Sequence, residues 1–331
     1  MVLDSLSRGI NAGMTAAEGR LPVEFDILDY EPEPWVPVDT VAVWKWRWWM
    51  LTGRLNILAV AEAGKRHLTP EQFDAFMRAE ANEETIVPSD EPAHTGGHDT
   101  GEGSNNWAVG GSRTASGGAI LATDPHNGVD LSRQWYQAQI TVPGIDAIGA
   151  FFLGTPGIYL GHTRGVAWGV TNHTASARDL YVETISADNP RLYQEAGEWQ
   201  PLTVVEEVLK VKGRPDETFQ IRETPRGPLV EAFVPKVEAK DLPPLSLKWM
   251  GAQATTGFEA MLALERSQSI EDVLSALEQW PFPILNFVFA DGQGRVGYHA
   301  AGQVPGRGKT FRGFRDGQRE DHGWDGVIPF D

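Results

Sequence analysis

The 331-residue chain contains no cysteine, which excludes a disulfide framework, a thiolate nucleophile and a cysteine-ligated zinc site. Basic residues are also scarce, because 28 Lys and Arg stand against 45 Asp and Glu and leave a net charge of −17. A nucleic-acid-binding surface needs basic side chains to neutralise phosphates, and an anionic membrane attracts basic segments. The sequence therefore predicts neither nucleic acid nor a membrane surface as a partner.

Long apolar runs and several common motifs are missing as well. The most apolar stretch, residues 148–161, is interrupted by glycine and proline, so no membrane-spanning helix is expected. The sequence has no G-x-S-x-G, no P-loop and no H-E-x-x-H motif. His94 and His98 lie on a glycine-rich stretch with no helix to fix them, so a metal site there is not favoured.

The N-terminus, MVLDSLSRGINAG, does not have the pattern of a secretory signal peptide. The location of the protein is therefore left open. A periplasmic or secreted location is expected if a full-length parent carries a signal peptide.

The order of elements predicts an α+β protein in three parts. Residues 1–81 have helical patterns, residues 82–103 form an acidic spacer rich in Pro and Gly, and residues 104–331 are rich in strands. Within the first part we expect an extended piece at 21–25 and one long helix that Asp39 caps and Gly64 ends. A further helix is opened by a capping box at Thr69 and Gln72. Within the third we expect nine strands before two helices, over 256–268 and 269–280, with Ser269 as the N-cap of the second. A closing hairpin is expected around 292–294.

The twelve tryptophans have two interpretations, a protein that handles aromatic or apolar surfaces and a tryptophan-rich core. The run WKWRWWM, residues 44–50, carries Lys45 and Arg47 among its aromatic residues. We expect one side of this helix to reach solvent or an acidic group.

Ser104 lies in GEGSNNWAVGG, residues 101–111, at the junction between the acidic spacer and the first strand. If the bond between Gly103 and Ser104 were cut, the new α-amino group would lie beside the hydroxyl of its own residue. An α-amino group has a reference pKa of about 7.7–8.0 and can act as a base near neutral pH. Nucleophile and base would then come from one residue. A Ser/Asn-rich turn before a strand is the alternative.

The stretch SNNWAVGGSRTASGGAILATDPH, residues 104–126, resembles the start of the β-chain of the penicillin acylase family, which are N-terminal-nucleophile hydrolases. The match consists of Ser-Asn-x-Trp, then Gly-Ser-x-Thr-x-Ser-Gly, then Asp-Pro-His. Residues 156–183 and 284–307 resemble later blocks of the β-chain, and residues 21–35 resemble the late α-chain. The resemblance implies a four-layer αββα fold, with α- and β-type chains derived from one precursor.

Site residues follow from the matched positions. The resemblance implies that Ser104 is the nucleophile and base, that Gly103 precedes the processing site, and that the backbone N–H of Asn172 and the amide of Asn286 form an oxyanion hole. His126 would support the Ser104 amine or the substrate, and Arg307 would hold the asparagine and the substrate. The substrate pocket is assigned to Trp48, Trp49, Met50, Asn127, Leu160 and Val170.

Cofactors and completeness also follow from the resemblance. Many relatives bind calcium, and Asp179 matches one ligand position, but the other matching positions hold Ser176 and Leu58, which cannot serve. No cofactor is therefore required, and a calcium site rests on Asp179 alone. Family members carry strands before the block that begins at residue 21 and a long region after the IPFD of residues 328–331. We therefore expect a fragment or a reduced member, with a fold incomplete at both ends.

The function implied is hydrolysis of a linear amide, such as the acyl side chain of a β-lactam or an acyl-homoserine lactone. The acyl side is expected to be apolar, because the assigned pocket residues carry no fixed charge. Two alternatives stay open. One is an inactive or incomplete fragment, and the other is a strand-rich module that binds apolar ligands.

Overall fold

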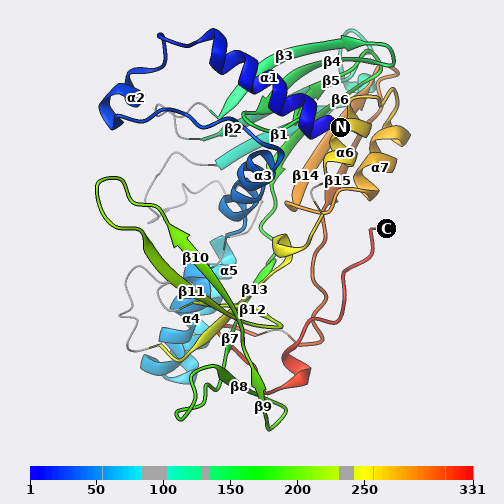
Figure 1. The fold of residues 1–331 in the computed structure, drawn as a ribbon. Helices are drawn as coiled ribbons and strands as arrows, with labels where there is room; N and C mark the ends of the chain where they lie inside the picture. The colour runs from blue at the N-terminus through cyan, green and yellow to red at the C-terminus, as the bar shows by residue number, and fades with distance from the viewer. Residues whose placement is uncertain are drawn as a thin grey trace.

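The structure is a computed structural model that describes residues 1–53, 55–83, 103–127, 134–230, 242–255, 257–309 and 311–330. Figure 1 shows two six-stranded sheets in separate halves of the molecule, with helix α3 between them. Five helices precede the first strand: α1 Val2–Ala16, α2 Val23–Leu28, α3 Pro37–Leu51, α4 Leu55–His67 and α5 Pro70–Glu83. Most of the expected acidic spacer, residues 84–102, lies outside the described residues.

The helical part differs from the sequence prediction in two places. The expected extended piece begins helix α2, which has Glu24 and Asp26 in its first turn, where carboxylates interact favourably with the helix dipole. The expected long helix is two helices, because Thr52 adopts an extended conformation and its hydroxyl accepts a hydrogen bond from Trp249 Nε1. Gly64 lies inside α4 and does not end it.

Two of the predicted helix starts lie in the helical part of the chain, at Asp39 and Thr69. Asp39 is not the N-cap of α3; it is the third helical residue, and its carboxylate accepts the N–H of Val36 at 2.7 Å. The capping box at the start of α5 is confirmed, because the Thr69 N–H donates to Gln72 Oε1 and the Gln72 N–H donates to Thr69 Oγ1.

The first sheet has the strand order β15-β14-β6-β5-β4-β3. Its strands are β3 Trp135–Val142, β4 Ile145–Phe152, β5 Leu160–His162, β6 Val166–Asn172, β14 Leu285–Asp291 and β15 Val296–Ala301. The strands β14 and β15 pair antiparallel, which confirms the predicted closing hairpin. The antiparallel pair β1 Gly103–Val109 and β2 Ile120–His126 packs on one face of this sheet. Gly169 of β6 allows that approach, since a Cβ there would lie 2.7 Å from Thr123.

The opposite face of the sheet packs on helices α6 Phe258–Leu264 and α7 Ile270–Glu278. Ser269 caps α7 as predicted, and its hydroxyl accepts the N–H of Asp272 at 3.2 Å. Aromatic rings fill the space between helices and sheet, with Trp44, Trp48 and Trp168 fully buried. Much of the tryptophan content therefore builds the core. The described residues thus provide three layers, in the order helix, sheet, sheet.

The second sheet has the order β10-β11-β12-β13-β7-β16. Its strands are β7 Arg178–Val182, β10 Thr203–Leu209, β11 Glu217–Thr224, β12 Gly227–Val230, β13 Leu245–Trp249 and β16 Arg315–Asp316. Helix α4 packs against β7, and Leu58, Leu180 and Leu247 form a smaller core there. A short hairpin, β8 Leu192–Glu195 and β9 Glu198–Pro201, lies beyond it. The sequence prediction missed β5, β8, β9, β13 and β16.

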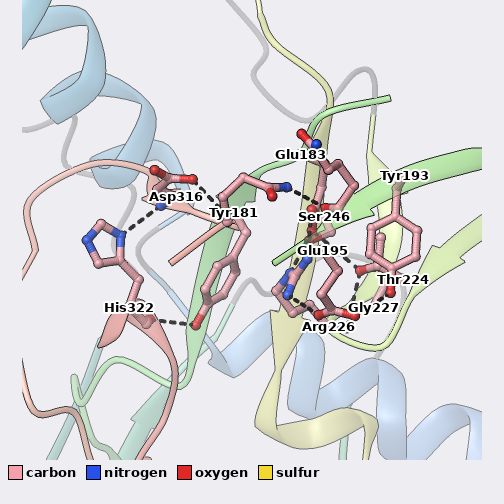
Figure 2. A network of polar contacts seen from close by, with 12 residues as sticks. Tyr181, Glu183, Tyr193, Glu195, Thr224, Arg226, Gly227, Ser246, Asp316 and His322 are labelled. Atoms are coloured by element: carbon pink, nitrogen blue, oxygen red, sulfur yellow. Dashed lines mark hydrogen bonds and ion pairs between the residues drawn. The ribbon is translucent and has the colours of Figure 1, made fainter. Parts of the chain in front are cut away.

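A buried ion pair joins the strands of the second sheet (Figure 2). The Glu183 carboxylate is fully buried and accepts hydrogen bonds from Arg226 Nε at 2.7 Å and Nη2 at 2.8 Å. Ser246 donates a third hydrogen bond at 2.5 Å. Buried charges are tolerated when they are paired and hydrogen-bonded in this way. The pair therefore fixes β7, β12 and β13 relative to one another.

The C-terminal segment is attached to the same sheet. The backbone N–H of Asp316 donates to His322 Nδ1 at 2.9 Å, and the Tyr181 hydroxyl donates to the His322 carbonyl at 3.1 Å (Figure 2). Among the described residues no helix is long and apolar enough to cross a membrane. The division of the chain at residues 81 and 104 remains a prediction.

Candidate active site

Ser104 is the second residue of β1, and burial alternates from residue to residue along this strand. Ser104 and Asn106 are half-buried, whereas Asn105 and Trp107 are exposed. The Ser104 hydroxyl donates a hydrogen bond to the carbonyl oxygen of Gly103 at 2.5 Å. The nucleophile predicted from the sequence therefore lies against the carbonyl group of the peptide bond predicted to be cut.

His126 ends β2 directly opposite Gly103 in the β1–β2 ladder. A Cβ placed on Gly103 would lie 3.5 Å from His126 Nδ1, so the imidazole flanks the peptide bond before Ser104. Its other nitrogen, Nε2, lies 3.1 Å from Asp124 Oδ2. This contact sets the orientation of the ring, although the side chains are 38% and 74% exposed.

A cavity of about 410 Å³ opens beside the hydroxyl of Ser104. It brings together seven of the residues assigned from the sequence: Met50 of α3, Gly103, Ser104, His126, Asn127, Val170 and Asn172. The cavity also has lining residues that sequence reasoning did not assign to the site: Arg47, Leu51, Pro125, Gln134, Trp135, Tyr159, Thr171, Thr174 and Leu285. Residues from both sides of the spacer therefore build one cavity.

The pairing of β6 with β14 determines where the N–H of Asn172, a predicted oxyanion-hole donor, points. The N–H of His173 donates to the carbonyl oxygen of Ile284 at 3.1 Å. Donors alternate in direction along an antiparallel strand, so the preceding N–H, that of Asn172, points away from β14. The Asn172 side chain is occupied elsewhere, because its amide donates to the Leu51 carbonyl at 2.8 Å.

Asn286 lies next to Asn172 across the β6–β14 pair. Its Nδ2 donates to the Asn172 carbonyl at 3.0 Å and to Thr171 Oγ1 at 3.2 Å. Its Oδ1 accepts a hydrogen bond from the Tyr298 hydroxyl at 2.7 Å, and this contact fixes which end of the amide faces Asn172. Tyr298 lies in the block 284–307 that resembles the family, but sequence reasoning did not assign it to the site.

The match to a known family covers almost the entire chain. A family model described as penicillin amidase matches residues 2–331. The chain belongs to the penicillin amidase family. The sequence is 28% identical to an acyl-homoserine lactone acylase of Pseudomonas aeruginosa and 29% identical to the penicillin acylase 2 proenzyme of Pseudomonas sp. strain SE83. These alignments cover 98% and 97% of this chain but 41% and 44% of the relatives, so the chain spans less than half their length.

A solved structure supports the fold. A thermostable penicillin G acylase from Alcaligenes faecalis aligns with a TM-score of 0.58 and 21% identity over 68% of this chain and 40% of the other. The recognition of the penicillin amidase family and the α+β fold class predicted from the sequence are confirmed.

Five of the predicted catalytic and substrate-binding residues do not line the Ser104 cavity, and Asn286, described above, is one of them. Trp48 is fully buried and packs edge-on against Trp44 and Phe282. Trp49 packs against Trp249 and the Arg178 guanidinium. Leu160 lines a separate cavity of about 740 Å³ between β2 and strands β3–β6.

Arg307 also lies outside the lining of this cavity, and it binds Asp179. Its Nε donates to Asp179 Oδ2 at 2.9 Å, and its Nη2 donates to the Ser176 carbonyl at 2.8 Å. Asp179 Oδ2 also accepts a hydrogen bond from Trp324 Nε1 at 2.6 Å and lies 3.1 Å from Arg315 Nε. The carboxylate that matches a calcium ligand is thus engaged by two arginines.

Within the described part of the chain, no group of three or more His, Asp or Glu side chains is arranged to hold a metal ion. Leu58, at the other matching position, is a core residue. The residues around Asp179 therefore do not fit calcium. His94 and His98 lie outside the described residues.

Proposed function

We propose that this chain is an amide hydrolase whose nucleophile, Ser104, is released by cleavage of the Gly103–Ser104 bond. The observation that carries the proposal is the 2.5 Å hydrogen bond from the Ser104 hydroxyl to the Gly103 carbonyl oxygen, beside a cavity that His126 and Asn172 also line. Membership of the penicillin amidase family supports it. The relatives named as acylases indicate small linear amides as the substrate class.

Processing begins when Ser104 Oγ attacks the Gly103 carbonyl carbon. The C–N bond breaks, the nitrogen takes a proton, and an ester links Gly103 to the Ser104 side chain. Water then hydrolyses the ester and leaves a carboxylate on Gly103 and a free α-amino group on Ser104. The products are an α-type chain that ends at residue 103 and a β-type chain that begins at residue 104.

The α-amino group then acts as the base in turnover. It takes the Ser104 hydroxyl proton as Oγ attacks the amide carbonyl of the substrate, and it returns the proton to the leaving amine. Water attacks the resulting acyl-ester and releases the acid. His126, which flanks the cleaved bond, positions the new amine, and Asp124 orients the His126 ring.

Two donors stabilise the oxyanion of each tetrahedral intermediate. The first donor is the Asn172 N–H, which is directed away from β14. The second donor is the side-chain amide of Asn286, which must first release the Asn172 carbonyl. Loss of one such donor typically costs about 10²–10³ in rate. Arg307 acts at a distance from the cavity, by holding Asp179 and the backbone of Ser176.

The test compares the wild-type chain with Ser104→Ala and Ser104→Cys, using p-nitroanilides of short acids as probes. We expect release of p-nitroaniline by the wild type, none by Ser104→Ala, and altered but measurable release by Ser104→Cys. A cooperatively folded wild-type chain that releases none would favour an inactive fragment. Apolar ligand binding that survives Ser104→Ala, without turnover by the wild type, would favour a binding module.

A further inference from the structure

Asp179 joins the start of β7 to the C-terminal segment that follows β15. Only 6% of its side chain is exposed. Its Oδ2 accepts hydrogen bonds from Arg307 Nε at 2.9 Å and from Trp324 Nε1 at 2.6 Å. The same oxygen lies 3.1 Å from Nε of Arg315, whose side chain is 2% exposed. One buried carboxylate therefore faces two guanidinium groups.

The two guanidinium groups also bind backbone oxygens from separate parts of the chain. Arg307 Nη2 donates to the Ser176 carbonyl at 2.8 Å, and its Nη1 donates to the Pro305 carbonyl at 3.2 Å. Arg315 Nη1 donates to the His322 carbonyl at 2.8 Å. Carboxylate and carbonyl oxygens are the ligands that calcium takes in proteins. The arginines therefore satisfy the kind of oxygen set that would otherwise suit a hard cation.

The surroundings of Asp179 carry more positive than negative charge. Lys248 lies directly opposite Asp179 in the β7–β13 ladder and is half-buried. Its Nζ lies 4.6 Å from the ring centroid of Trp324. Lys248, Arg307 and Arg315 thus place three cations around one carboxylate. Because like charges repel strongly away from bulk water, a calcium ion beside Asp179 would be destabilised.

The same contacts reach the part of the chain that carries a predicted oxyanion donor. The connection between β6 and β7 starts directly after Asn172. Thr174 of this connection lines the Ser104 cavity, and the carbonyl of Ser176 is held by Arg307. The position of this cavity wall therefore depends on Arg307, although Arg307 itself does not line the cavity.

We propose that Arg307 and Arg315 replace a metal ion as the cross-link at Asp179, and that this cross-link positions the β6–β7 connection for catalysis. Arg307 is then a positioning residue, because it acts through the backbone of Ser176 and not on the substrate. Folding, processing and turnover need no divalent cation. The catalytic consequence rests on the proposed function, whereas the cross-link itself does not.

The first measurement asks whether the chain needs calcium. The intact wild-type chain is freed of metals with EDTA, and its Tm and rate of p-nitroanilide hydrolysis are measured with and without CaCl2. We expect equal Tm and equal rate, and no binding of CaCl2 by calorimetry. Terbium is a second probe, because the Trp324 indole would excite an ion bound at Asp179. A Tm that falls in EDTA and returns with calcium, or terbium emission that Asp179→Asn abolishes, would overturn the proposal.

The second measurement tests the cross-link through stability. Asp179→Asn keeps the shape of the side chain but leaves two buried guanidinium groups without their carboxylate, so Tm should fall by about 5 °C or more. Asp321→Asn is the matched control. Asp321 also pairs with two cations, Lys309 and Arg319, but it is 42% exposed, so its loss should change Tm little. Equal falls in Tm would overturn the cross-link.

A double-mutant cycle shows whether Asp179 and Arg315 act on each other. Each single variant, Asp179→Asn or Arg315→Met, already removes the contact between the two side chains. The combined variant should therefore lose less Tm than the sum of the two single losses. Strictly additive losses would overturn the pairing that the cross-link requires.

The third measurement tests the positioning role. Arg307→Met should lower kcat for p-nitroanilides by about tenfold or more with little change in KM, because a displaced oxyanion donor weakens an interaction made in the transition state. Arg307→Lys keeps a cation beside Asp179 and should recover part of the lost kcat. Arg319→Met removes an exposed arginine and should leave kcat unchanged. An Arg307→Met variant with the kcat of the wild type would overturn the positioning role.

These results separate the inference from the proposed function. If no anilide is cleaved, but Tm is unaffected by EDTA and falls in Asp179→Asn far more than in Asp321→Asn, the cross-link stands. The proposed hydrolysis then fails, and the positioning role fails with it. If anilides are cleaved by a Ser104-dependent route but EDTA lowers Tm and calcium restores it, hydrolysis stands and the cross-link is overturned.

Discussion

The side-chain amide of Asn106 donates a hydrogen bond to the backbone carbonyl of Asn286 at 3.1 Å. A second, longer hydrogen bond reaches the carbonyl of Gly169 at 3.4 Å. These contacts attach strand β1 to the face of the large sheet, two residues after Ser104. The position of the nucleophile relative to Asn172 and Asn286 therefore depends on one asparagine that the sequence reading did not assign.

Asn106→Ala should slow both cleavage before Ser104 and amide turnover by about tenfold or more, because a misplaced reacting atom is costly. It should also lower the free energy of unfolding by about 1 kcal/mol, because the side-chain hydrogen bonds that hold β1 on the sheet are lost. Processing is followed on gels and stability by urea denaturation. Asn105→Ala is the matched control, since Asn105 is exposed on the other face of β1. Equal behaviour of the two variants would contradict the role of Asn106.

Tyr298→Phe tests how the Asn286 amide is oriented. Without the hydrogen bond from the Tyr298 hydroxyl to Oδ1, the amide can rotate and present oxygen where a donor is needed. We expect kcat to fall by about tenfold with little change in KM, because the effect concerns an interaction made in the transition state. Tyr136→Phe, on exposed β3, is the control. A fall in kcat that is no larger than that of the control would show that Tyr298 does not position Asn286.

Arg226→Met should destabilise the second sheet. The variant leaves the fully buried Glu183 carboxylate without its cation, which typically costs about 3–5 kcal/mol. Arg319→Met removes an exposed pair with Asp321 and should cost far less than Arg226→Met, because water screens an exposed ion pair. Urea denaturation of both variants measures the difference. Similar losses of unfolding free energy for the two variants would contradict the role of the buried Glu183–Arg226 pair in Figure 2.

Elements defined by local pattern were predictable from the sequence. The β14–β15 hairpin follows from two apolar runs around a glycine turn, and the caps at Thr69 and Ser269 follow from short-range hydrogen bonds. The break at Thr52 was not predictable, because the hydrogen bond at that residue comes from Trp249, 197 residues away. Short strands such as β5 and β16 depend on pairing with distant strands.

The candidate site divides in the same way. Five residues that line the cavity were assigned from sequence motifs: Ser104, His126, Asn127, Val170 and Asn172. Arg47 was not, because its environment is built by α3, β3 and β4 together, and nothing in the run WKWRWWM distinguishes a buried arginine from a solvated one. Asp179 was assigned to calcium from one matched position, although its partners Arg307, Arg315 and Trp324 lie more than 120 residues away in sequence.

Glu265 gives the protein a defined pH dependence. Its buried carboxylate accepts the N–H of Ile158 at 2.8 Å, and burial raises its pKa above the ordinary value of 4.5. A raised folded-state pKa means that the stability contributed by this group is present below the unfolded pKa and is lost as pH rises through the folded pKa.

Glu265→Gln keeps the acceptor oxygen and removes the charge. The variant should therefore be more stable than the wild type near pH 8, and the advantage should shrink toward pH 4. Urea midpoints at a series of pH values measure this, with Glu278→Gln as a control on the exposed side of α7. A difference that does not vary with pH would contradict the assignment to Glu265.

The central claim is that Ser104 becomes an N-terminal nucleophile, and intact mass spectrometry of the purified chain tests it most directly. The account predicts two fragments, residues 1–103 and residues 104–331, from the wild type after incubation near neutral pH. Ser104→Ala should give one uncut mass. A wild-type chain that is cooperatively folded and still shows one mass, or a cut that also occurs in Ser104→Ala, would contradict the claim.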